Sequence, residues 1–348
     1  MAVILIRADA SPTIGNGHVM RCFALAEALL DKGQQPVFTI ARPADAVLAR
    51  LSAAGLGYHA IPYVGGSRED LSATLALIDA LQVGGVVLDG YQFDVGYRAG
   101  LAAARRRVLI FDDLAELPAL YADVVVNPSI QATPAMYARS APAAALLLGP
   151  GYAPLRREIQ VAAQKPLSDI RERRSLLLTF GGSDPLGLTL PCIEHLAPRL
   201  PAGCRLEVVV GSGNLQTIKI VTAAQRFECV DVHCDTLRMG ELMARAGLAI
   251  SAGGGTMAEL AALGVATLAV LIADNQAPSA AAAGHDWFDL IDARHGDVVP
   301  QIATRAIALW NDPGRRYAMS NAARALVDGN GASRIARAFS ALLSAQGS

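Results

Sequence analysis

Residues 2–20 read AVILIRADASPTIGNGHVM, and they set the pattern of the whole chain. An uninterrupted apolar run leads into a loop that contains Gly15, and a helical pattern begins at Gly17. Continuous apolar runs are typical of parallel strands, because the helices that connect such strands cover both faces of the sheet. The stretch therefore predicts a strand, a loop and a helix that open a parallel α/β domain.

The same alternation recurs along most of the 348 residues. In the first half it predicts strands at 2–7, 36–40, 58–61, 85–89, 107–111 and 123–126, and helices at 17–32, 44–54, 67–81 and 94–104. In the second half it predicts strands at 175–180, 205–210, 227–230, 248–251 and 267–271, and helices at 188–199, 215–224, 237–246, 256–263 and 277–283. Right-handed crossovers between such strands produce doubly wound sheets.

The pattern weakens between residues 142 and 173, where Gly149-Pro150-Gly151 and Pro154 precede a polar run. We expect an N-terminal Rossmann-like domain at 1–150 and a linker region at 151–173 with one short helix near 156–163. A C-terminal Rossmann-like domain should follow at 174–348, with a helical tail from residue 298. The predicted fold class is thus α/β, with two facing doubly wound domains.

The composition of the chain argues against several classes of protein and of site. Apolar residues make up 53% of the chain, and 30 basic residues nearly balance 31 acidic ones, so no basic field favours nucleic acid. No apolar run reaches the roughly 18 residues of a membrane-spanning helix. The N-terminus lacks a basic leader, which favours a cytoplasmic protein. Five thinly spread cysteines suggest no disulfide framework, and Cys229, His233 and Cys234 lack the second ligand pair that a zinc site needs.

The first loop can hold an anion. Gly15 and Gly17 allow close approach to backbone amides at a helix N-terminus. Met20 stands where a dinucleotide-binding loop has its third glycine, and no Gly-Lys-Ser/Thr follows, so neither NAD nor a Walker loop is indicated. His18 lies in the first helical turn, where the helix dipole disfavours imidazolium. A neutral imidazole can accept a proton, so His18 is a candidate general base. A tight turn with a histidine that caps or packs is the alternative.

The second half has two further loops of this kind. Phe180-Gly181-Gly182-Ser183-Asp184-Pro185 and Ser251-Ala252-Gly253-Gly254-Gly255-Thr256 both follow predicted strands. Three successive glycines before a helix can cradle a diphosphate. Glu259, one turn into that helix, could bind a ribose diol or could simply complement the helix dipole. Asp274-Asn275-Gln276 adds amide groups at the same sheet edge.

Polar groups also end the strands of the first half, at Asp89-Gly90-Tyr91, Asp112-Asp113 and Asn127-Pro128-Ser129. Ligands of doubly wound sheets bind at the carboxyl ends of the strands. Each group could be a turn, but together they exceed what turns require, and we expect at least one in the active site.

The segments Ile6–Ser11 and Ile14–Cys22 closely resemble the opening motif of a hydrolase of pseudaminic acid biosynthesis. The substrate of that family is UDP-2,4-diacetamido-2,4,6-trideoxy-β-L-altropyranose. Further similarity lies in 127–129, 149–156, 180–184, 253–259 and 275–276. The glycine loops and Asn-Gln are shared more widely, among others with the peptidoglycan GlcNAc-transferase.

The resemblance implies a GT-B fold, a UDP-sugar as the binding partner, and neither a metal nor another cofactor. It also implies that water cleaves the anomeric C–O bond with inversion. The chain contains no Asp-x-Asp motif, which agrees with a site that needs no metal. His18 matches the histidine regarded as essential, Glu259 the ribose-binding glutamate, and Asn275 and Gln276 the amides near sugar and phosphates. The expected catalytic residues are His18, Asp89 and Tyr91. The expected substrate-binding residues are Arg7, Asp9, Gly15, Asn16, Gly17, Asn127, Gly182, Ser183, Asp184, Ser251, Gly253, Gly254, Gly255, Thr256, Glu259, Asn275 and Gln276.

One departure from the family bears on the function. Asp89-Gly90-Tyr91 stands where the family often has Asp-His-Tyr, which leaves the identity of the sugar open. A GT-B glycosyltransferase that uses a UDP-sugar donor, and a non-catalytic protein that binds nucleotide sugars, are the two alternatives.

Overall fold

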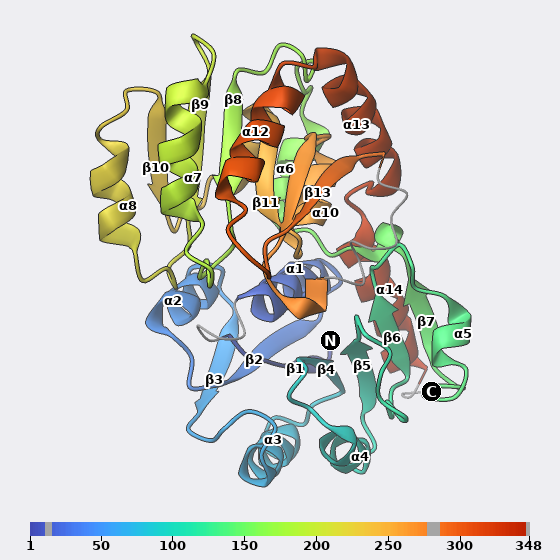
Figure 1. Ribbon diagram of the computed structural model, residues 1–348. Coiled ribbons are helices and arrows are strands. Elements are labelled where there is room, and N and C mark those ends of the chain that lie inside the picture. Colours follow the sequence, from blue (N-terminus) through green and yellow to red (C-terminus); the bar gives the residue numbers. More distant parts are fainter. Residues whose placement is uncertain (11–15, 277–285, 346–348) are drawn as a thin grey trace. The chain divides into compact units, whose positions relative to one another are not determined.

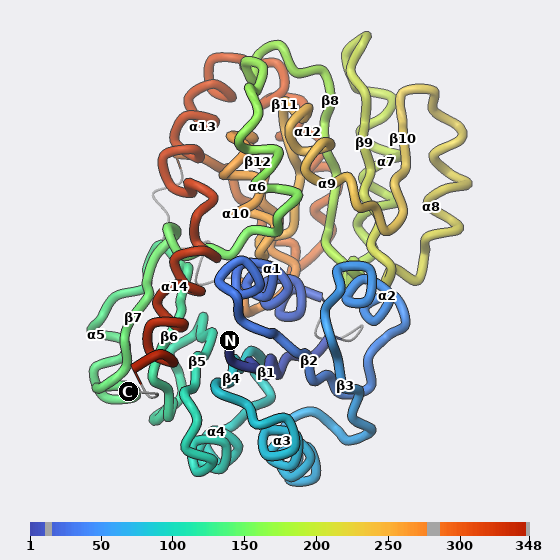
Figure 2. The backbone as a smooth tube through the Cα atoms, turned by 180° about the vertical axis from the view of Figure 1, so that it is seen from behind, coloured from blue at the N-terminus to red at the C-terminus, as the bar shows by residue number. Residues whose placement is uncertain are grey.

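The computed structural model describes residues 1–10, 16–276 and 286–345, which form two compact units. The first unit comprises residues 1–156 and the segment from Asn330 onward, and the second comprises Arg157–Gly329. Figures 1 and 2 trace the chain from opposite sides. Within the described residues, no helix has both the length and the apolar character needed to cross a membrane.

The first unit is built on a parallel seven-stranded sheet of order β3-β2-β1-β4-β5-β6-β7. Its strands are β1 (Val3–Ala8), β2 (Gln35–Ala41), β3 (Gly57–Ile61), β4 (Gly85–Asp89), β5 (Arg107–Phe111), β6 (Val124–Asn127) and β7 (Ala145–Leu148). Its helices are α1 (Gly17–Asp31), α2 (Asp45–Ala53), α3 (Arg68–Ala80), α4 (Val95–Ala102), α5 (Pro134–Tyr137), the 3₁₀ turn η1 (Pro150–Tyr152) and α14 (Gly331–Ser344).

Alternate residues of each strand enter two separate cores, as the period of two along a strand requires. Ile4 and Ile6 of β1 pack on one face with α1 and α14. Leu5 packs on the other face with Ile78 of α3 and Leu101 of α4. The continuous apolar runs in the sequence thus correspond to strands that are covered on both sides.

The last helix, α14, belongs to the first unit and not to the second. It packs against α1, and Ala332, Ile335, Ala336 and Phe339 are buried in the same core as Ile4 and Ile6. The expected division placed residues 330–348 with the second domain and began a linker at 151. The apolar stripe of α14 instead covers one face of the first sheet, and the chain passes into the second unit at Arg157.

The second unit is built on a parallel six-stranded sheet of order β10-β9-β8-β11-β12-β13. Its strands are β8 (Ser175–Thr179), β9 (Arg205–Val210), β10 (Val230–Cys234), β11 (Ala246–Ala252), β12 (Thr267–Leu271) and β13 (Phe288–Asp292). Its helices are α6 (Arg157–Gln164), α7 (Thr189–Leu196), α8 (Thr217–Ala224), α9 (Met239–Arg245), α10 (Thr256–Ala262), α12 (Val299–Trp310) and α13 (Pro313–Leu326), with 3₁₀ turns η2 (Ala197–Arg199) and η3 (Asp274–Gln276).

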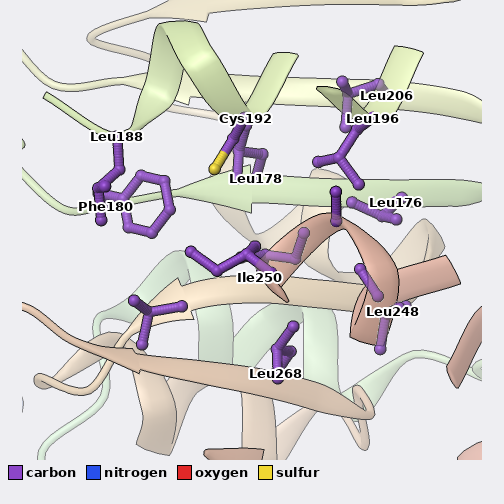
Figure 3. Packing of buried hydrophobic residues seen from close by; sticks show 14 of the residues in the cluster. Leu176, Leu178, Phe180, Leu188, Cys192, Leu196, Leu206, Leu248, Ile250 and Leu268 are labelled. Carbon is purple, nitrogen blue, oxygen red and sulfur yellow. The ribbon is translucent and has the colours of Figure 1, made fainter. Parts of the chain in front are cut away.

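The main core of this unit lies between the sheet and helices α7, α8 and α12. Figure 3 shows Leu178 of β8 and Ile250 of β11 close to Cys192 of α7, and all three side chains are buried. Leu177 and Ala249, one residue along each strand, are buried outside this cluster. The second sheet is therefore covered on both faces, as in the first unit.

The structure confirms the predicted strands in the interior of both sheets and the edge strand β3, and it differs from the prediction at the other three edges. Strands β7 and β13 were not predicted, and the strand expected at 227–230 lies instead at 230–234 as β10. All three are edge strands with half-exposed or polar positions, so they lack the continuous apolar run of an interior strand. The helix expected at 277–283 lies outside the described residues.

Candidate functional site

Both sheets reverse their strand order once, and the candidate residues follow the strands on either side of that point. In the first sheet the reversal lies between β1 and β4, and in the second between β8 and β11. In doubly wound sheets the crevice outside the carboxyl ends of these strands is where ligands bind. Arg7, Asp9 and His18 follow or end β1, and Asp89 and Tyr91 end or follow β4.

His18 and Asp89 form a buried pair. His18 lies in the first turn of α1, and its Nδ1 is 2.7 Å from Oδ1 of Asp89 at the end of β4. The His18 side chain is 8% exposed and the Asp89 side chain is fully buried. Among the described residues, no hydrogen bond to His18 Nε2 is found. In the tautomer in which Nδ1 carries the proton and donates a hydrogen bond to Asp89, the lone pair of Nε2 is available as a base.

Arg21, one turn further along α1, ties Asp89 to a second carboxylate. Its guanidinium donates to both oxygens of Asp89, with Nη2 2.7 Å from Oδ1. Its Nη1 donates to both oxygens of Asp113 at 2.8 Å. The guanidinium also lies over the Phe111 ring, 4.8 Å from its centroid. Arg21 is thus held by two acidic residues and an aromatic face.

Tyr91 closes this network into a ring of contacts. Its hydroxyl donates to Asp113 Oδ2 at 3.0 Å, and its aromatic ring meets His18 edge-on with 4.8 Å between centroids. The residue is 44% exposed, in contrast to the buried pair beneath it. We call His18, Asp89, Arg21, Asp113 and Tyr91 the charged ring. It brings together the three residues expected to be catalytic.

The charged ring keeps Asp89 ionised. Burial alone would raise the pKa of Asp89, but attraction to Arg21 and His18, together with their hydrogen bonds, lowers it to about 2. The Cys22 thiol donates to Asp89 Oδ2 at 3.5 Å, and burial and the nearby carboxylate hold the pKa of that thiol well above its usual range. Asp89 is therefore an anion that stabilises positive charge on the imidazole.

Arg7 and Asp9 lie in a second buried cluster on the same unit. Arg7 is fully buried and donates to both oxygens of Asp70, to both oxygens of Asp9 and to the carbonyl of Thr39. Asp9 also accepts from the backbone N–H of Ala41 at 2.7 Å. Attraction to the two carboxylates outweighs burial and raises the pKa of Arg7. These contacts favour a bracing role for Arg7 over direct contact with a ligand.

Gly90 lies between the two clusters and has φ +154°. A Cβ built there would lie 2.4 Å from Oε1 of Gln92, whose Nε2 donates to Asp9 at 2.8 Å. The space where the resembling family often carries a histidine side chain is thus occupied by the Gln92 amide. Any larger residue at 90 would have to displace that amide.

The remaining first-unit candidates are placed differently. Asn16 precedes α1 and is half-buried, and Gly17 is exposed with open space around its Cα. Gly15 lies outside the described residues. Asn127 is fully buried at the end of β6, where its amide donates to the Tyr137 hydroxyl at 2.8 Å and accepts from the Ser129 N–H. Asn127 therefore holds the loop after β6 together.

In the second unit, the loop after β8 packs against the loop after β9. The N–H of Gly213 donates to the carbonyl of Gly182 at 3.0 Å. A Cβ on Gly211 would lie 2.5 Å from Gly182 Cα, so only glycine permits this approach. Ser183 is half-buried, and the Asp184 carboxylate accepts from the N–H groups of Leu188 and Thr189 at 2.9 and 2.8 Å. Asp184 thus binds the backbone N–H groups of Leu188 and Thr189 at the start of α7.

The triple-glycine loop after β11 lies beside the loop after β12. A Cβ on Gly253 would lie 3.4 Å from Gln276 Oε1, and that oxygen accepts from the Ile272 N–H at 3.1 Å. Gly254 and Gly255 are exposed, and Thr256 begins α10. Ser251 is buried at the end of β11, Glu259 is 9% exposed in the first turn of α10, and Asn275 is exposed in η3.

Five residues that complete these sites were given no role of their own by the sequence: Arg21, Gln92, Gly211, Gly213 and Asp113, although Asp112-Asp113 was among the strand-end groups of which at least one was expected in the active site. Arg21 is in the motif that carries the resemblance, and Asp113 and the Gly211-Ser212-Gly213-Asn214 run follow strands. Their position directly after a strand was the one feature of the sequence that could have pointed to Asp113, Gly211 and Gly213. Which carboxylate Arg21 reaches, 68 or 92 residues away, depends on the strand order.

Among the described residues, no group of three or more metal-binding side chains is found. His233, considered above beside Cys229 and Cys234, has its Nε2 2.6 Å from Oε2 of Glu207 on the neighbouring strand. It therefore contacts a carboxylate across the neighbouring strands β10 and β9.

Comparisons with known proteins agree with this fold. An uncharacterized protein of Methanocaldococcus jannaschii is 24% identical over 269 residues, which cover 75% of this chain and 54% of that protein. The chain thus spans about half the length of the curated relative it matches. The sequence matches no protein-family model.

Solved structures match nearly the whole chain. UDP-GlcNAc 2-epimerase from Neisseria meningitidis, bound to UDP-GlcNAc, has a TM-score of 0.70 and 12% identity over 97% of this chain and 99% of its own. Anabaena HepE, in complex with UDP and glucose, has a TM-score of 0.60 and 14% identity over 98% and 100%. The predicted fold class, two Rossmann-like α/β domains of the GT-B type with a helical C-terminal region, is confirmed.

Proposed function

We propose that this protein hydrolyses a UDP-linked sugar at the anomeric carbon–oxygen bond and releases UDP. The observation that carries the proposal is the His18–Asp89 pair, in which Nδ1 is 2.7 Å from a buried carboxylate. A carboxylate on one imidazole nitrogen fixes the tautomer and leaves the other nitrogen as the base. His18 is the candidate base, and Asp89 orients it.

The chemistry needs one base and a good leaving group. As the water oxygen bonds to the anomeric carbon, His18 Nε2 takes a proton from the water. The bond from the anomeric carbon to the phosphate oxygen breaks, and its electron pair leaves with UDP. Attack opposite the leaving group inverts the anomeric configuration. Asp89 stabilises the imidazolium that forms, and a general base of this kind contributes about 10²–10⁴-fold.

The nucleotide is assigned to the second unit. Ordinary glycoside hydrolysis uses a second carboxylic acid to protonate a poor leaving group. A nucleoside diphosphate leaves without that proton if backbone N–H groups stabilise its charge. In this proposal the N–H groups of the glycine loops at 181–183 and 253–255, which follow β8 and β11 on either side of the switch point, bind the diphosphate, and Glu259 binds the ribose.

The choice of UDP is supported by the solved structures with this fold that hold UDP or UDP-GlcNAc. The choice of sugar, a diacetamido-trideoxyhexose of pseudaminic acid biosynthesis, rests on the resemblance of the motif at 6–22. Gly90 is compatible with a different sugar, because the Gln92 amide occupies the space of a side chain there.

A glycosyltransferase is the second candidate. Glycosyltransferases are among the solved structures with this fold. In that reaction His18 would deprotonate an acceptor hydroxyl in place of water, and the rest of the site would work in the same way.

One experiment separates these functions. The protein is incubated with UDP-diacetamido sugars and UDP-GlcNAc in ¹⁸O-labelled water, and the anomeric signal is followed by time-resolved NMR. We expect a free sugar of inverted configuration that carries the label at the anomeric oxygen. Label in UDP would mean cleavage of the P–O bond and would overturn the mechanism. Turnover only after an acceptor is added would select the glycosyltransferase, and UDP binding without turnover would select a non-catalytic binding protein.

A further inference from the structure

The charged ring contains one carboxylate more than the His18–Asp89 pair needs. Asp113 does not touch His18 directly. It accepts two hydrogen bonds from Arg21 at 2.8 Å and one from the Tyr91 hydroxyl at 3.0 Å. Its side chain is 20% exposed and that of Arg21 is 18% exposed, so water screens this ion pair only partly.

The charges in the ring are unequal when His18 is neutral. The two carboxylates Asp89 and Asp113 face a single guanidinium, and one negative charge is left over. When His18 takes a proton, the ring becomes neutral. Without Asp113, the Arg21 charge would already cancel that of Asp89, and protonation of His18 would create an uncompensated buried cation, which is unfavourable.

We propose that Arg21 and Asp113 are positioning residues that set, with opposite signs, how readily His18 accepts a proton. Arg21 holds Asp89 ionised and aligned beneath the imidazole, and Asp113 offsets the positive charge that Arg21 brings. The proposal rests on the proposed function, because it assigns His18 as the base. Neither residue contacts the reacting atoms in this scheme, and both act through Asp89 and His18.

Few other charges reach His18 in the described part of the chain. Asp89 contacts it from β4, Tyr91 from the loop after β4, and Arg21 from its own helix, with Arg21 Nη2 3.4 Å from His18 Nδ1. The Arg98 guanidinium on α4 is attracted to both Asp89 and Asp112. The Cys22 thiol stays protonated, since burial raises its pKa. The charge balance at His18 is therefore set by Asp89, Arg21 and Asp113.

The test uses two variants that change the charge in opposite directions. Asp113→Asn removes a negative charge, so imidazolium is less favourable and the acidic limb of the pH–rate profile moves to lower pH. Arg21→Met removes a positive charge, so the limb moves to higher pH. Charges within about 4–6 Å commonly shift a titration by one unit or more, and we expect each limb to move by about one unit.

Three further variants separate charge from shape. Tyr91→Phe removes the hydrogen bond to Asp113 without changing any charge, and the limb should stay where it is. Arg21→Lys keeps the charge and loses the fork geometry, so the limb should lie near its wild-type position while kcat falls below the wild-type value, because Asp89 is less well aligned. The double variant Arg21→Met with Asp113→Asn restores the wild-type charge balance and should show little net shift.

A second readout does not depend on turnover. The ring resonances of His18, assigned among the six histidines by comparison with His18→Gln, are titrated by NMR in the full-length protein. Opposite displacements in Asp113→Asn and Arg21→Met support the proposal even if no UDP-sugar is turned over. Displacements of the same sign, or none in variants that keep the wild-type circular dichroism spectrum, overturn it. An active enzyme that does not need His18 would instead refute the proposed function.

Discussion

The edges formed by the carboxyl ends of the strands differ in composition between the two sheets. In the first unit, buried and partly buried charged side chains contact one another in the charged ring and in the Arg7 cluster. In the second unit, glycine loops bring backbone close to backbone, as at Gly182 and Gly211. Ionised side chains can take up and release protons, whereas glycine loops can present N–H groups to an anion. The contrast suggests that chemistry is assigned to the first edge and binding to the second.

The largest effects on turnover and binding should come from replacing one residue on each edge. His18→Gln removes the base, so kcat should fall by about 10²–10⁴-fold while UDP binding persists. Glu259→Gln should instead weaken UDP binding by about 10- to 100-fold, because a charged hydrogen bond contributes about 1.5–3 kcal/mol. Steady-state kinetics and calorimetry measure the two.

His59→Gln is the matched control for the first exchange, since His59 is a half-buried histidine on β3 away from the charged ring. It should leave both kcat and UDP binding unchanged. Equal loss of turnover and binding in His18→Gln would show that the histidine is structural, and the contrast between the edges would fail.

A pair of glycine variants sharpens the account of the second edge. Gly211→Ala places a methyl group 2.5 Å from Gly182 Cα and carbonyl oxygen, so the loop must move. Overpacking of this kind typically destabilises by about 1–3 kcal/mol. Gly255→Ala meets nothing within 4 Å, so it should leave stability nearly unchanged and weaken UDP binding. Urea unfolding and calorimetry on both proteins test this, and equal stabilities would contradict the tight contact between the loops.

Acid should affect the first edge through Asp89. Its folded-state pKa of about 2 lies below the ordinary value, so the stabilisation is present above about pH 4 and is lost as the pH falls toward 2. At neutral pH the contribution is about 2 kcal/mol. We expect the stability difference between wild type and Asp89→Asn to shrink from pH 5 to pH 3 in urea unfolding. A difference that does not change with pH would mean that Asp89 is not specially stabilised as an anion.

The smallest effect concerns Asp184, which lies on the second edge and was expected to bind substrate. Because its carboxylate binds two backbone N–H groups at the start of α7, Asp184→Ala should reduce the free energy of unfolding by about 1 kcal/mol. Asp184→Asn keeps one of the two accepting oxygens and should recover part of that loss. If Asp184→Ala abolished UDP binding without any loss of stability, the residue would be a ligand contact and not a structural one.

The sequence was most informative where one physical requirement dominates. Interior strands such as β1 and β4 must be apolar throughout, so their positions could be predicted, while the edge strands β7 and β13 have no such requirement. The pattern of the sequence also placed His18 at the start of the helix after the first strand and Asp89 at the end of the strand that becomes β4, and the two side chains meet in the fold.

The partners of these residues could not be predicted in the same way. A polar residue after a strand can either contact a ligand or brace a loop, and Asn127 and Asp184 turn out to make bracing hydrogen bonds. The contacts of Arg21 with Asp89 and Asp113 depend on β4 and β5 lying next to each other on the same side of β1. Nothing in the local sequence around Arg21 specifies that order.

The return of α14 to the first unit affects how the protein is made. A ribosome synthesises α1 some 300 residues before the helix that covers it, since α1 ends at Asp31 and α14 begins at Gly331. The nascent first unit must wait, with the surface around Ile4 and Ile6 uncovered by Phe339, while all of the second unit emerges as one uninterrupted segment. The second unit can therefore complete its core while the first unit still lacks α14.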